Sequence, residues 1–121
     1  MIAITIPYPP SVNTYWRHVI IGKSPRTLIS AKGREYKRDV AHACAASGAA
    51  GRRLTGRLAV TLTACAPDRR ARDIDNVSKA TLDALTEAGL WLDDEQIDRL
   101  VIERGPVTKG GEMQVTVEVI Q

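Results

Sequence analysis

The sequence predicts an α+β domain in which a small mixed β-sheet of about four or five strands carries two main helices on one face. Three observations lead to this expectation. Segments rich in Val, Ile and Thr occur near both ends of the chain and at its middle, two longer segments repeat apolar residues at helical spacing, and Gly- or Pro-rich stretches separate them. Because the 121 residues contain no repeat, linker or low-complexity tract, we expect a single domain, residues 1–121.

The first half of the chain is expected to form a strand, a hairpin and a helix. Residues 2–7, IAITIP, alternate in the manner of a strand, and the prolines of PYPP then end it because they cannot continue a ladder. The following segment, TYWRHVIIGKSPRTLIS, has room for a short hairpin that turns at residues 22–25. Ser30 is placed to N-cap a helix over residues 31–47, since its hydroxyl can accept from an unpaired backbone N–H.

The second half is expected to contain strands around one further helix. Residues 57–67 are expected to form a strand, and residues 76–88 form the clearest helix because one apolar stripe runs along them. Residues 91–99, WLDDEQIDR, are expected to form a turn or a short helix. Two closing strands, residues 99–105 and 112–120, are then expected to pair as a hairpin through PVTKGG.

The chain is divided into a basic half and an acidic half. Residues 1–57 contain ten Lys or Arg and two acids, a net charge of +8, whereas residues 58–121 contain seven Lys or Arg and twelve acids, a net charge of −5, which together make the overall +3. A basic half suits a polyanion such as nucleic acid. An acidic half with clustered aspartates suits a divalent metal ion. The alternative is that the two halves simply attract each other across the fold.

Several classes of protein are disfavoured. No apolar run approaches the roughly 18 residues that a membrane helix needs, and the N-terminus lacks the features of a signal peptide. Cys44 and Cys65 lack metal-ligand spacing and are expected to be buried, reduced thiols. We therefore expect a cytoplasmic location and no membrane partner. Tyr15, Trp16 and Trp91 are expected to pack in the core, with stacking on unpaired bases as the alternative.

The stretch RDIDNVSK, residues 72–79, is the main candidate for chemistry. Asp73 and Asp75 lie one residue apart, and in an extended backbone their side chains would point to the same face. Mg²⁺ prefers such carboxylate oxygens, together with water and phosphate. The alternative for Asp75 is structural, since an aspartate here could N-cap the helix that follows. The arginines just upstream are candidates to hold phosphates; they are Arg69, Arg70 and Arg72.

Two further residues each have more than one explanation. Lys79 lies one turn after Asp75, where it could steer the scissile phosphate, protonate the leaving oxygen, or only pair with Asp75 and Asp83. Asp94, in the second acidic cluster LDDEQID, could supply a third metal ligand or only favour the start of a short helix. A helix of about 13 residues is ~20 Å long, which separates Asp94 from Asp73. Either the intervening chain retraces that length nearly extended, or an antiparallel twofold pairing of two chains supplies Asp94 from a partner.

Three strings carry a resemblance to a known family. PDRRARDIDNVSKATLDALTEAGLWLDD, the later PVTKGG and the N-terminal PYPPSVNTYWRH resemble the RusA family of Holliday junction resolvases. The resemblance runs from about Ile4 to Val119, and its motifs are specific in combination because Asp-x-Asp-Asn, a downstream Lys and Trp-Leu-Asp-Asp occur at fixed spacing. Ala71 interrupts an arginine run that some relatives carry unbroken, which would weaken the hold on DNA rather than the chemistry.

The resemblance implies a homodimeric, Mg²⁺-dependent endonuclease, with Mn²⁺ as the expected substitute ion. Such an enzyme nicks two opposed strands of four-way junction DNA and leaves ends that can be ligated. The family's essential acids fall on Asp73, Asp75 and Asp94, and its essential lysine falls on Lys79. These three acids would hold the metal ion, while Lys79 would stabilise the scissile phosphate or supply a proton. The expected phosphate contacts are Arg69, Arg70, Arg72, Arg17 and Lys109.

Three other functions remain open at this level. The chain could be a dimeric DNA-binding module without catalysis, in which the acids are purely structural. It could instead be a metal-dependent nuclease for other branched nucleic acids. A small phosphohydrolase acting on free nucleotides is the weakest of the three, because the basic first half and the additional arginines favour a longer polyanion.

Overall fold

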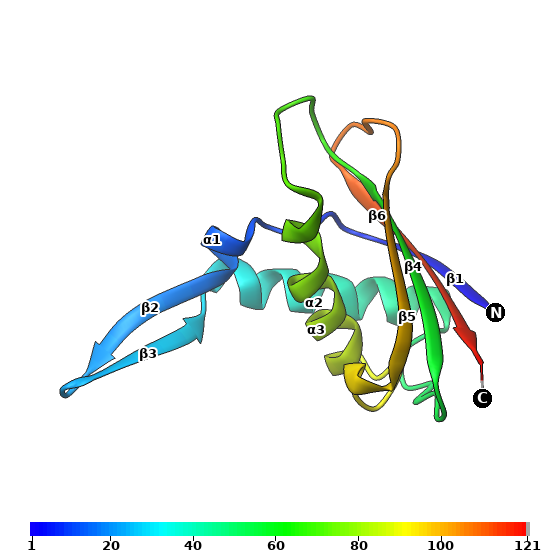
Figure 1. Ribbon diagram of the computed structural model, residues 1–121, viewed down its shortest axis with the longest axis horizontal. Helices are drawn as coiled ribbons and strands as arrows, with labels where there is room; N and C mark the ends of the chain where they lie inside the picture. Colours follow the sequence, from blue (N-terminus) through cyan, green and yellow to red (C-terminus); the bar gives the residue numbers. More distant parts are fainter. Residues whose placement is uncertain (121) are drawn as a thin grey trace.

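Four strands form the main sheet, and two more form a separate hairpin (Figure 1). The structure, a computed structural model, describes residues 1–120, without the side chains of residues 12, 13, 18, 21, 25 and 26. In chain order the elements are β1 (Ile2–Ile6), α1 (Val12–Tyr15), β2 (Trp16–Ile21), β3 (Ser24–Ile29), α2 (Ala31–Ser47), β4 (Leu58–Cys65), the 3₁₀ turn η1 (Ile74–Val77), α3 (Ser78–Glu87), the 3₁₀ turn η2 (Asp94–Gln96), β5 (Ile97–Arg104) and β6 (Glu112–Val119).

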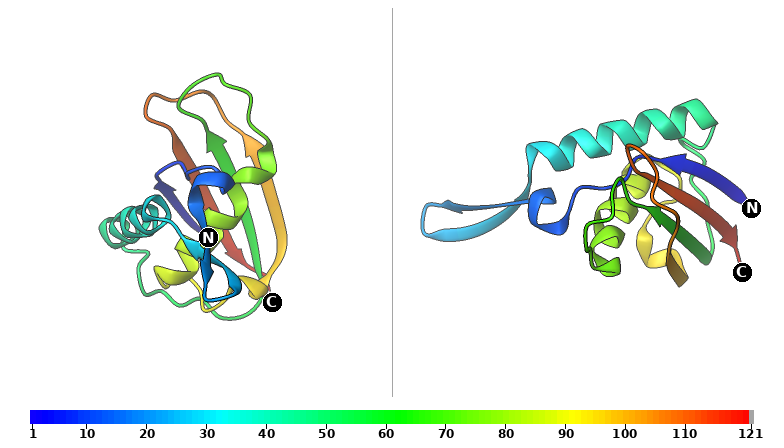
Figure 2. Two further views of the ribbon diagram at one scale, coloured as in Figure 1. Left: turned by 90° about the vertical axis from the view of Figure 1, so that its left-hand side faces the viewer. Right: turned by 90° about the horizontal axis from the view of Figure 1, so that it is seen from above.

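The main sheet is mixed, as predicted, and its strand order is β1-β6-β4-β5. β6 is antiparallel to both β1 and β4, whereas β5 runs parallel to β4. The parallel pair requires a long crossover connection, and α3 lies within it. Both long helices, α2 and α3, pack on the same face of the sheet, also as predicted (Figure 2).

The predicted hairpin between the two closing strands is wrong. β4 lies between β5 and β6, and residues 105–111 cross over the end of β4 to reach its other side. The crossover through α3 already places β5 on one side of β4, so β6 takes the opposite side. Gly105 permits the close crossing, because a Cβ at this position would lie 2.6 Å from the Sγ of Cys65 and 2.8 Å from the Cγ2 of Thr63.

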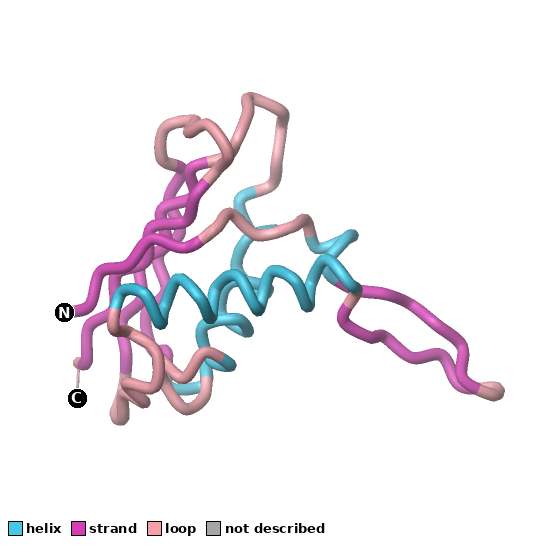
Figure 3. Tube along the Cα trace, turned by 180° about the vertical axis from the view of Figure 1, so that it is seen from behind, coloured by secondary structure: helices cyan, strands magenta, loops and turns pink. Residues whose placement is uncertain are grey.

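β2 and β3 pair in antiparallel fashion and form an arm, residues 16–29, that projects away from the sheet and the helices (Figure 3). The chain turns between the two strands at residues 22–23, within the predicted turn. The short helix α1 leads into the arm and was not predicted; Ser11 caps it by accepting from the backbone N–H of Thr14.

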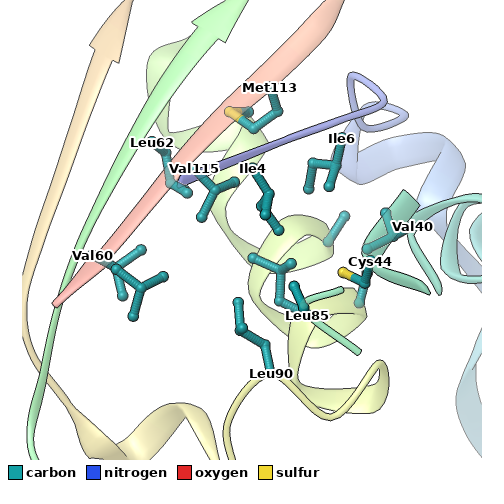
Figure 4. Close-up of a cluster of buried hydrophobic side chains, with 14 of the residues drawn as sticks. Ile4, Ile6, Val40, Cys44, Val60, Leu62, Leu85, Leu90, Met113 and Val115 are labelled. Atoms are coloured by element: carbon teal, nitrogen blue, oxygen red, sulfur yellow. The ribbon is translucent and has the colours of Figure 1, made fainter. Parts of the chain in front are cut away.

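One hydrophobic core joins the sheet to both helices. Alternate residues of β1, β4 and β6 point toward α2 and α3, which is why one face of the sheet is buried. Figure 4 labels ten of the core side chains: Ile4, Ile6, Val40, Cys44, Val60, Leu62, Leu85, Leu90, Met113 and Val115. Tyr15 and Trp91 are also buried and Trp16 packs against the same cluster, so the prediction that these aromatic residues belong to the core is confirmed.

The predicted helix over residues 31–47 is confirmed at both ends. The Ser30 Oγ accepts from the backbone N–H of Gly33 at 3.0 Å, as an N-cap should. Both cysteines are buried and free, as expected. Within the part of the chain that the structure describes, no helix combines the length and the apolar character needed to cross a membrane.

Candidate active site

The connection between β4 and η1, residues 66–73, is called the arginine loop below, and Asp68 organises it. The Asp68 Oδ1 accepts from the backbone N–H of Arg70 at 3.0 Å and forms an ion pair of 2.8 Å with the Nη1 of Arg72. The hydrogen bond from Arg72 is the main reason that the pKa of Asp68 falls to about 2. The Arg72 guanidinium also lies 5.9 Å from the centre of the Tyr8 ring. Arg72 therefore braces the loop.

Two arginines of the loop face solvent. Arg69 is exposed and forms no ion pair with any residue that the structure describes. The side chain of Arg70 is 83% exposed, and its Nε approaches the Oδ2 of Asp68 only to 3.5 Å. Both guanidinium groups are therefore available to phosphates, whereas that of Arg72 is already engaged.

The other two predicted phosphate contacts lie in different places. Lys109 is exposed on the loop 105–111, which lies beside the arginine loop (Figure 1) because the backbone N–H of Thr108 donates to the Ala66 carbonyl at 2.9 Å. Arg17 is exposed on β2, within the arm and distant from both loops (Figure 1). The structure thus brings Lys109 to the arginine loop but leaves Arg17 apart from it.

Asp73 and Asp75 flank the start of η1 and are both exposed. Asp73 is extended, but Ile74 already belongs to the 3₁₀ turn, so the expectation of an extended Asp-x-Asp is only half correct. The structural alternative, in which Asp75 caps the helix, is wrong, because Val77 occupies the N-cap position of α3 without a side-chain hydrogen bond. Among the described residues, neither carboxylate has a hydrogen-bond or ion-pair partner.

Lys79, in the first turn of α3, forms an ion pair with Asp83 rather than with Asp75. The Nζ of Lys79 lies 3.4 Å from the Oδ1 of Asp83, and the lysine side chain is 57% exposed. An exposed pair of this kind is worth only about 0.2–1 kcal/mol, so a phosphate could replace Asp83 as the partner of Lys79 at little cost.

Asp94 is half-buried in η2 and lies on the flank of α3. Burial raises the pKa of its carboxyl, and a hydrogen bond with Asp93 and the negative charges of Asp93 and Asp83 raise it further, whereas the Lys79 charge lowers it. A small hollow beside it is lined by Asp83, Thr86 and other residues of this region. Asp94 is thus close to Lys79 and Asp83 in its own chain.

The three predicted metal ligands do not come together within one chain. Asp73 and Asp75 precede α3, whereas Asp94 follows it and shares a hollow with Asp83, Thr86 and Glu87 of that helix. Among the described residues, no three His, Cys, Asp or Glu side chains gather closely enough to hold a metal ion. One chain therefore offers a pair of exposed carboxylates and, separately, a third.

Several residues of the site were not anticipated. Asp93, not Asp94, caps η2, and Gln96 completes a capping box by accepting from the backbone N–H of Asp93 at 2.9 Å. The amide nitrogen of Gln96 also donates to the carbonyls of Leu54 and Gly56, both at 3.0 Å, which fixes the turn that presents Asp94. The spacing of the capping box in LDDEQ is a local signal that could have shown this. The tertiary contacts of Gln96 have no such signal.

A cleft of about 630 Å³ opens beside Asp73. The proline-rich segment 7–11 forms one wall, α2 forms another, and the arginine loop closes it. The hydroxyl of Tyr36 donates to the Pro7 carbonyl at 2.9 Å and fixes the proline-rich wall against α2. The cleft joins segments far apart in the sequence and could not be predicted from it.

This fold and this site define a class of protein. A small α+β domain that holds unpaired carboxylates at the start of a helix, beside exposed arginines, has the features of a nuclease that uses a metal ion. Residues 7–120 match the family model described as Endodeoxyribonuclease RusA. The chain belongs to the RusA endodeoxyribonuclease family.

Curated relatives support the same assignment. The chain is 43% identical over 118 residues to the crossover junction endodeoxyribonuclease of Enterobacteria phage 82, covering 94% of this chain and 91% of the relative. It is 41% identical over 119 residues to the crossover junction endodeoxyribonuclease RusA of Escherichia coli strain K12, covering 95% and 92%. The enzyme of the same name from Shigella sonnei strain Ss046 has the same identity and coverage.

Proposed function

We propose that this chain is a crossover junction endodeoxyribonuclease, which cuts the phosphodiester backbone of four-way junction DNA during recombination and repair. The observation that carries the proposal is the 41–43% identity to enzymes of that name over 94–95% of the chain. The exposed, unpaired carboxylates beside the arginine loop supply the matching chemistry. An enzyme with this substrate would work in the cytoplasm, where recombining bacterial DNA lies.

The proposal assigns Asp73, Asp75 and Asp94 as ligands of Mg²⁺, with Mn²⁺ as a substitute. The donor set fits, because Asp73 and Asp75 present carboxylate oxygens that no described residue occupies. When bound, the ion would relieve charge on the phosphate and lower the pKa of a water molecule. Lys79 would leave Asp83 and hold the scissile phosphate, while Arg69, Arg70 and Lys109 hold the phosphates on either side.

The proposal also includes a homodimer in which Asp94 of the partner subunit completes each site. Exposed apolar side chains support it: Ile74 is 38%, Leu92 54% and Leu100 40% exposed. Ile74 precedes α3, Leu92 follows it, and Leu100 belongs to β5, which is one of the two edge strands of the main sheet. An antiparallel twofold pairing over this side would bury all three residues. It would also carry the partner's Asp94 toward the start of α3.

A cleavage assay tests the function directly. A synthetic four-way junction, a flapped duplex and a linear duplex of matched sequence are incubated with the protein in Mg²⁺, in Mn²⁺ and in EDTA. We expect paired nicks in two opposed strands of the junction with either ion, none in EDTA, and none in the linear duplex. Binding without cutting would favour a DNA-binding module, and preferential cutting of the flap would favour a nuclease for other branched DNA.

A further inference from the structure

The arm, residues 16–29, is firmly attached at its base. Trp16 and Ile29 pack against the core cluster, and the backbone N–H of Ser30 donates to the Tyr15 carbonyl at 2.9 Å. Gly33 lets α2 press against this base, since a Cβ there would lie 2.6 Å from the Cγ2 of Ile29 and 2.8 Å from the Tyr15 carbonyl oxygen. The direction of the arm is therefore set by packing.

Among the side chains that the structure describes, none from the distal part of the arm packs against the core cluster. This part extends away from the sheet and from both long helices (Figures 1 and 3). Ile20, near the turn, is 76% exposed, and Leu28, next to the base of the arm, is 43% exposed. A two-stranded hairpin is marginally stable in water by itself. Exposed apolar side chains on such an arm therefore indicate a surface that a partner covers.

The two apolar side chains lie on opposite faces of the arm. Leu28 is directly across the ladder from Arg17, and Ile20 is three residues farther along β2 than Arg17. Because successive side chains of a strand alternate between faces, Ile20 points away from the side that carries Arg17 and Leu28. Each face of the arm thus carries one exposed apolar side chain, Leu28 near the base and Ile20 near the turn, which suits insertion between two surfaces better than docking on one.

The charge of the arm selects the partner. Its basic residues are Arg17, Lys23 and Arg26, it contains no acid, and the first acid of the chain is Glu35. A positive arm complements phosphates. The two surfaces between which it fits are then the faces of base pairs, against which proteins insert apolar side chains at unstacked steps.

We propose that the arm enters the branch point of a four-way DNA junction. Ile20 and Leu28 lie against the base-pair faces that the crossover leaves unstacked, while Arg17 and Lys23 contact the phosphates of the exchanging strands. A linear duplex offers no such opening, so the arm favours junctions over duplexes. This inference rests on the proposed function and identifies the element that selects its substrate.

The test compares Ile20→Ser with Val119→Ser. Val119 is a matched control because it is also an exposed branched residue in a strand, 54% exposed, at the end of β6. Binding to a labelled junction and to a duplex of matched sequence is measured by fluorescence anisotropy in EDTA. We expect Ile20→Ser to weaken junction binding at least fivefold and to change duplex binding less than twofold, while Val119→Ser matches the wild type. Leu28→Ser provides a second, independent variant.

A base analogue reports on the insertion itself. With 2-aminopurine at the branch point, the wild-type protein should change the fluorescence strongly and Ile20→Ser should not. Unchanged junction binding by both arm variants, or an equal loss on junction and duplex, would overturn the proposal. A dimeric wild type and a monomeric Ile20→Ser in sedimentation would also overturn it, because a second copy would then cover the arm. If the wild type does not cut junctions in Mg²⁺, the proposed nuclease function is wrong. The ratio of junction binding to duplex binding, which tests the arm, does not depend on that result.

Discussion

The carboxylate of Asp75 is exposed and has no hydrogen-bond or ion-pair partner among the described residues. Its substitution should therefore affect chemistry and not folding. We expect Asp75→Asn to lower junction cleavage by more than about 100-fold, since even residues that only orient metal ligands cost 10–100-fold. Junction binding should stay equal or become tighter, because one negative charge near the phosphates is removed. Gel-shift and cleavage assays measure the two effects, and Glu118→Gln, exposed on β6, is the control.

Normal cutting by Asp75→Asn would remove this residue from the metal site. A parallel loss of binding and cleavage would assign it to the hold on DNA instead. Thermal unfolding of the variant separates both outcomes from misfolding, because no packing contact of Asp75 supports the core.

The carboxyl of Asp94 should control the acid limb of the pH–rate profile. It must be ionised to bind a metal ion, and its pKa is raised by burial and then by Asp93. Asp93→Asn removes the negative charge but keeps a side-chain oxygen for the backbone N–H of Glu95, so η2 should still be capped. The pKa of Asp94 should then fall, and the acid limb should move to lower pH. An acid limb that stays in place would show that another group limits activity at low pH.

For single residues, the sequence predicts those roles that depend only on neighbours in the chain. Ser30 caps α2 as expected, because an N-cap depends only on residues a few positions away. Asp75 fails as a cap because a 3₁₀ turn precedes α3 and moves the cap position to Val77. The brace between Asp68 and Arg72 was missed, although its i,i+4 spacing was visible, because that spacing is informative in helices and these residues form a loop.

In the arginine loop, Asp68 holds Arg72 in an ion pair that supports the loop, whereas Arg69 and Arg70 face solvent and are available to phosphates. Asp68→Asn should keep the acceptor for the backbone N–H of Arg70 but release the guanidinium of Arg72. We expect tighter DNA binding with a steeper salt dependence, because one more cation meets phosphate, by a slope of about 0.9. Cleavage per bound junction should fall, since the loop that positions Asp73 loses its brace. An unchanged salt slope would show that Arg72 does not reach DNA.

The crossing of residues 105–111 over β4 depends on one glycine. Gly105→Ala should cost about 1–3 kcal/mol of unfolding free energy, because the added Cβ would lie 2.6 Å from the Cys65 Sγ. Denaturant unfolding measures the loss. Combining it with Cys65→Ala, which removes that sulfur, should recover part of the stability, and the double-mutant cycle should show coupling between the two positions. Additive losses would mean that the backbone shifts to accept the methyl group.

The positions of the helices and strands along the chain were predicted more accurately than which strands pair with each other. The closing strands exist close to the expected ranges, but they pair with β4 and β1 and not with each other. Strand pairing is decided by the crossover through α3, a contact between segments far apart in the chain. The arm was visible as a hairpin, whereas its projection from the fold depends on packing of α2 against its base.

At the scale of the whole molecule, a single chain does not bring the three predicted metal ligands together. The acids predicted as one metal site lie at separate places along α3, and the described residues of one chain form no cluster of three ligands. Composition and motif spacing could identify these acids, but not which subunit supplies each of them. Only the assembly determines whether Asp94 acts with Asp75 of its own chain or of another.

Mixed dimers distinguish the two arrangements. We expect Asp75→Asn and Asp94→Asn each to be inactive alone, and a mixture of the two, allowed to exchange subunits, to regain nicking. In a shared site, one of the two sites of the mixed dimer combines both substitutions, and the other combines Asp75 and Asp94 that are both intact. If each site used one chain, every site would carry a substitution and the mixture would stay inactive.

The number of DNA strands nicked in each junction gives a second test of the shared site. A mixed dimer with one intact shared site should nick a single strand of each junction, so the product should be a nicked junction and not two separated duplexes. Native and denaturing gels of the same reaction distinguish these products. Adding excess Asp75→Asn to wild-type protein should likewise convert paired nicks into single ones, because every exchanged dimer keeps only one active site. Paired nicks from the mixture of inactive variants would contradict a twofold dimer with two shared sites, since such a dimer cannot contain two intact sites.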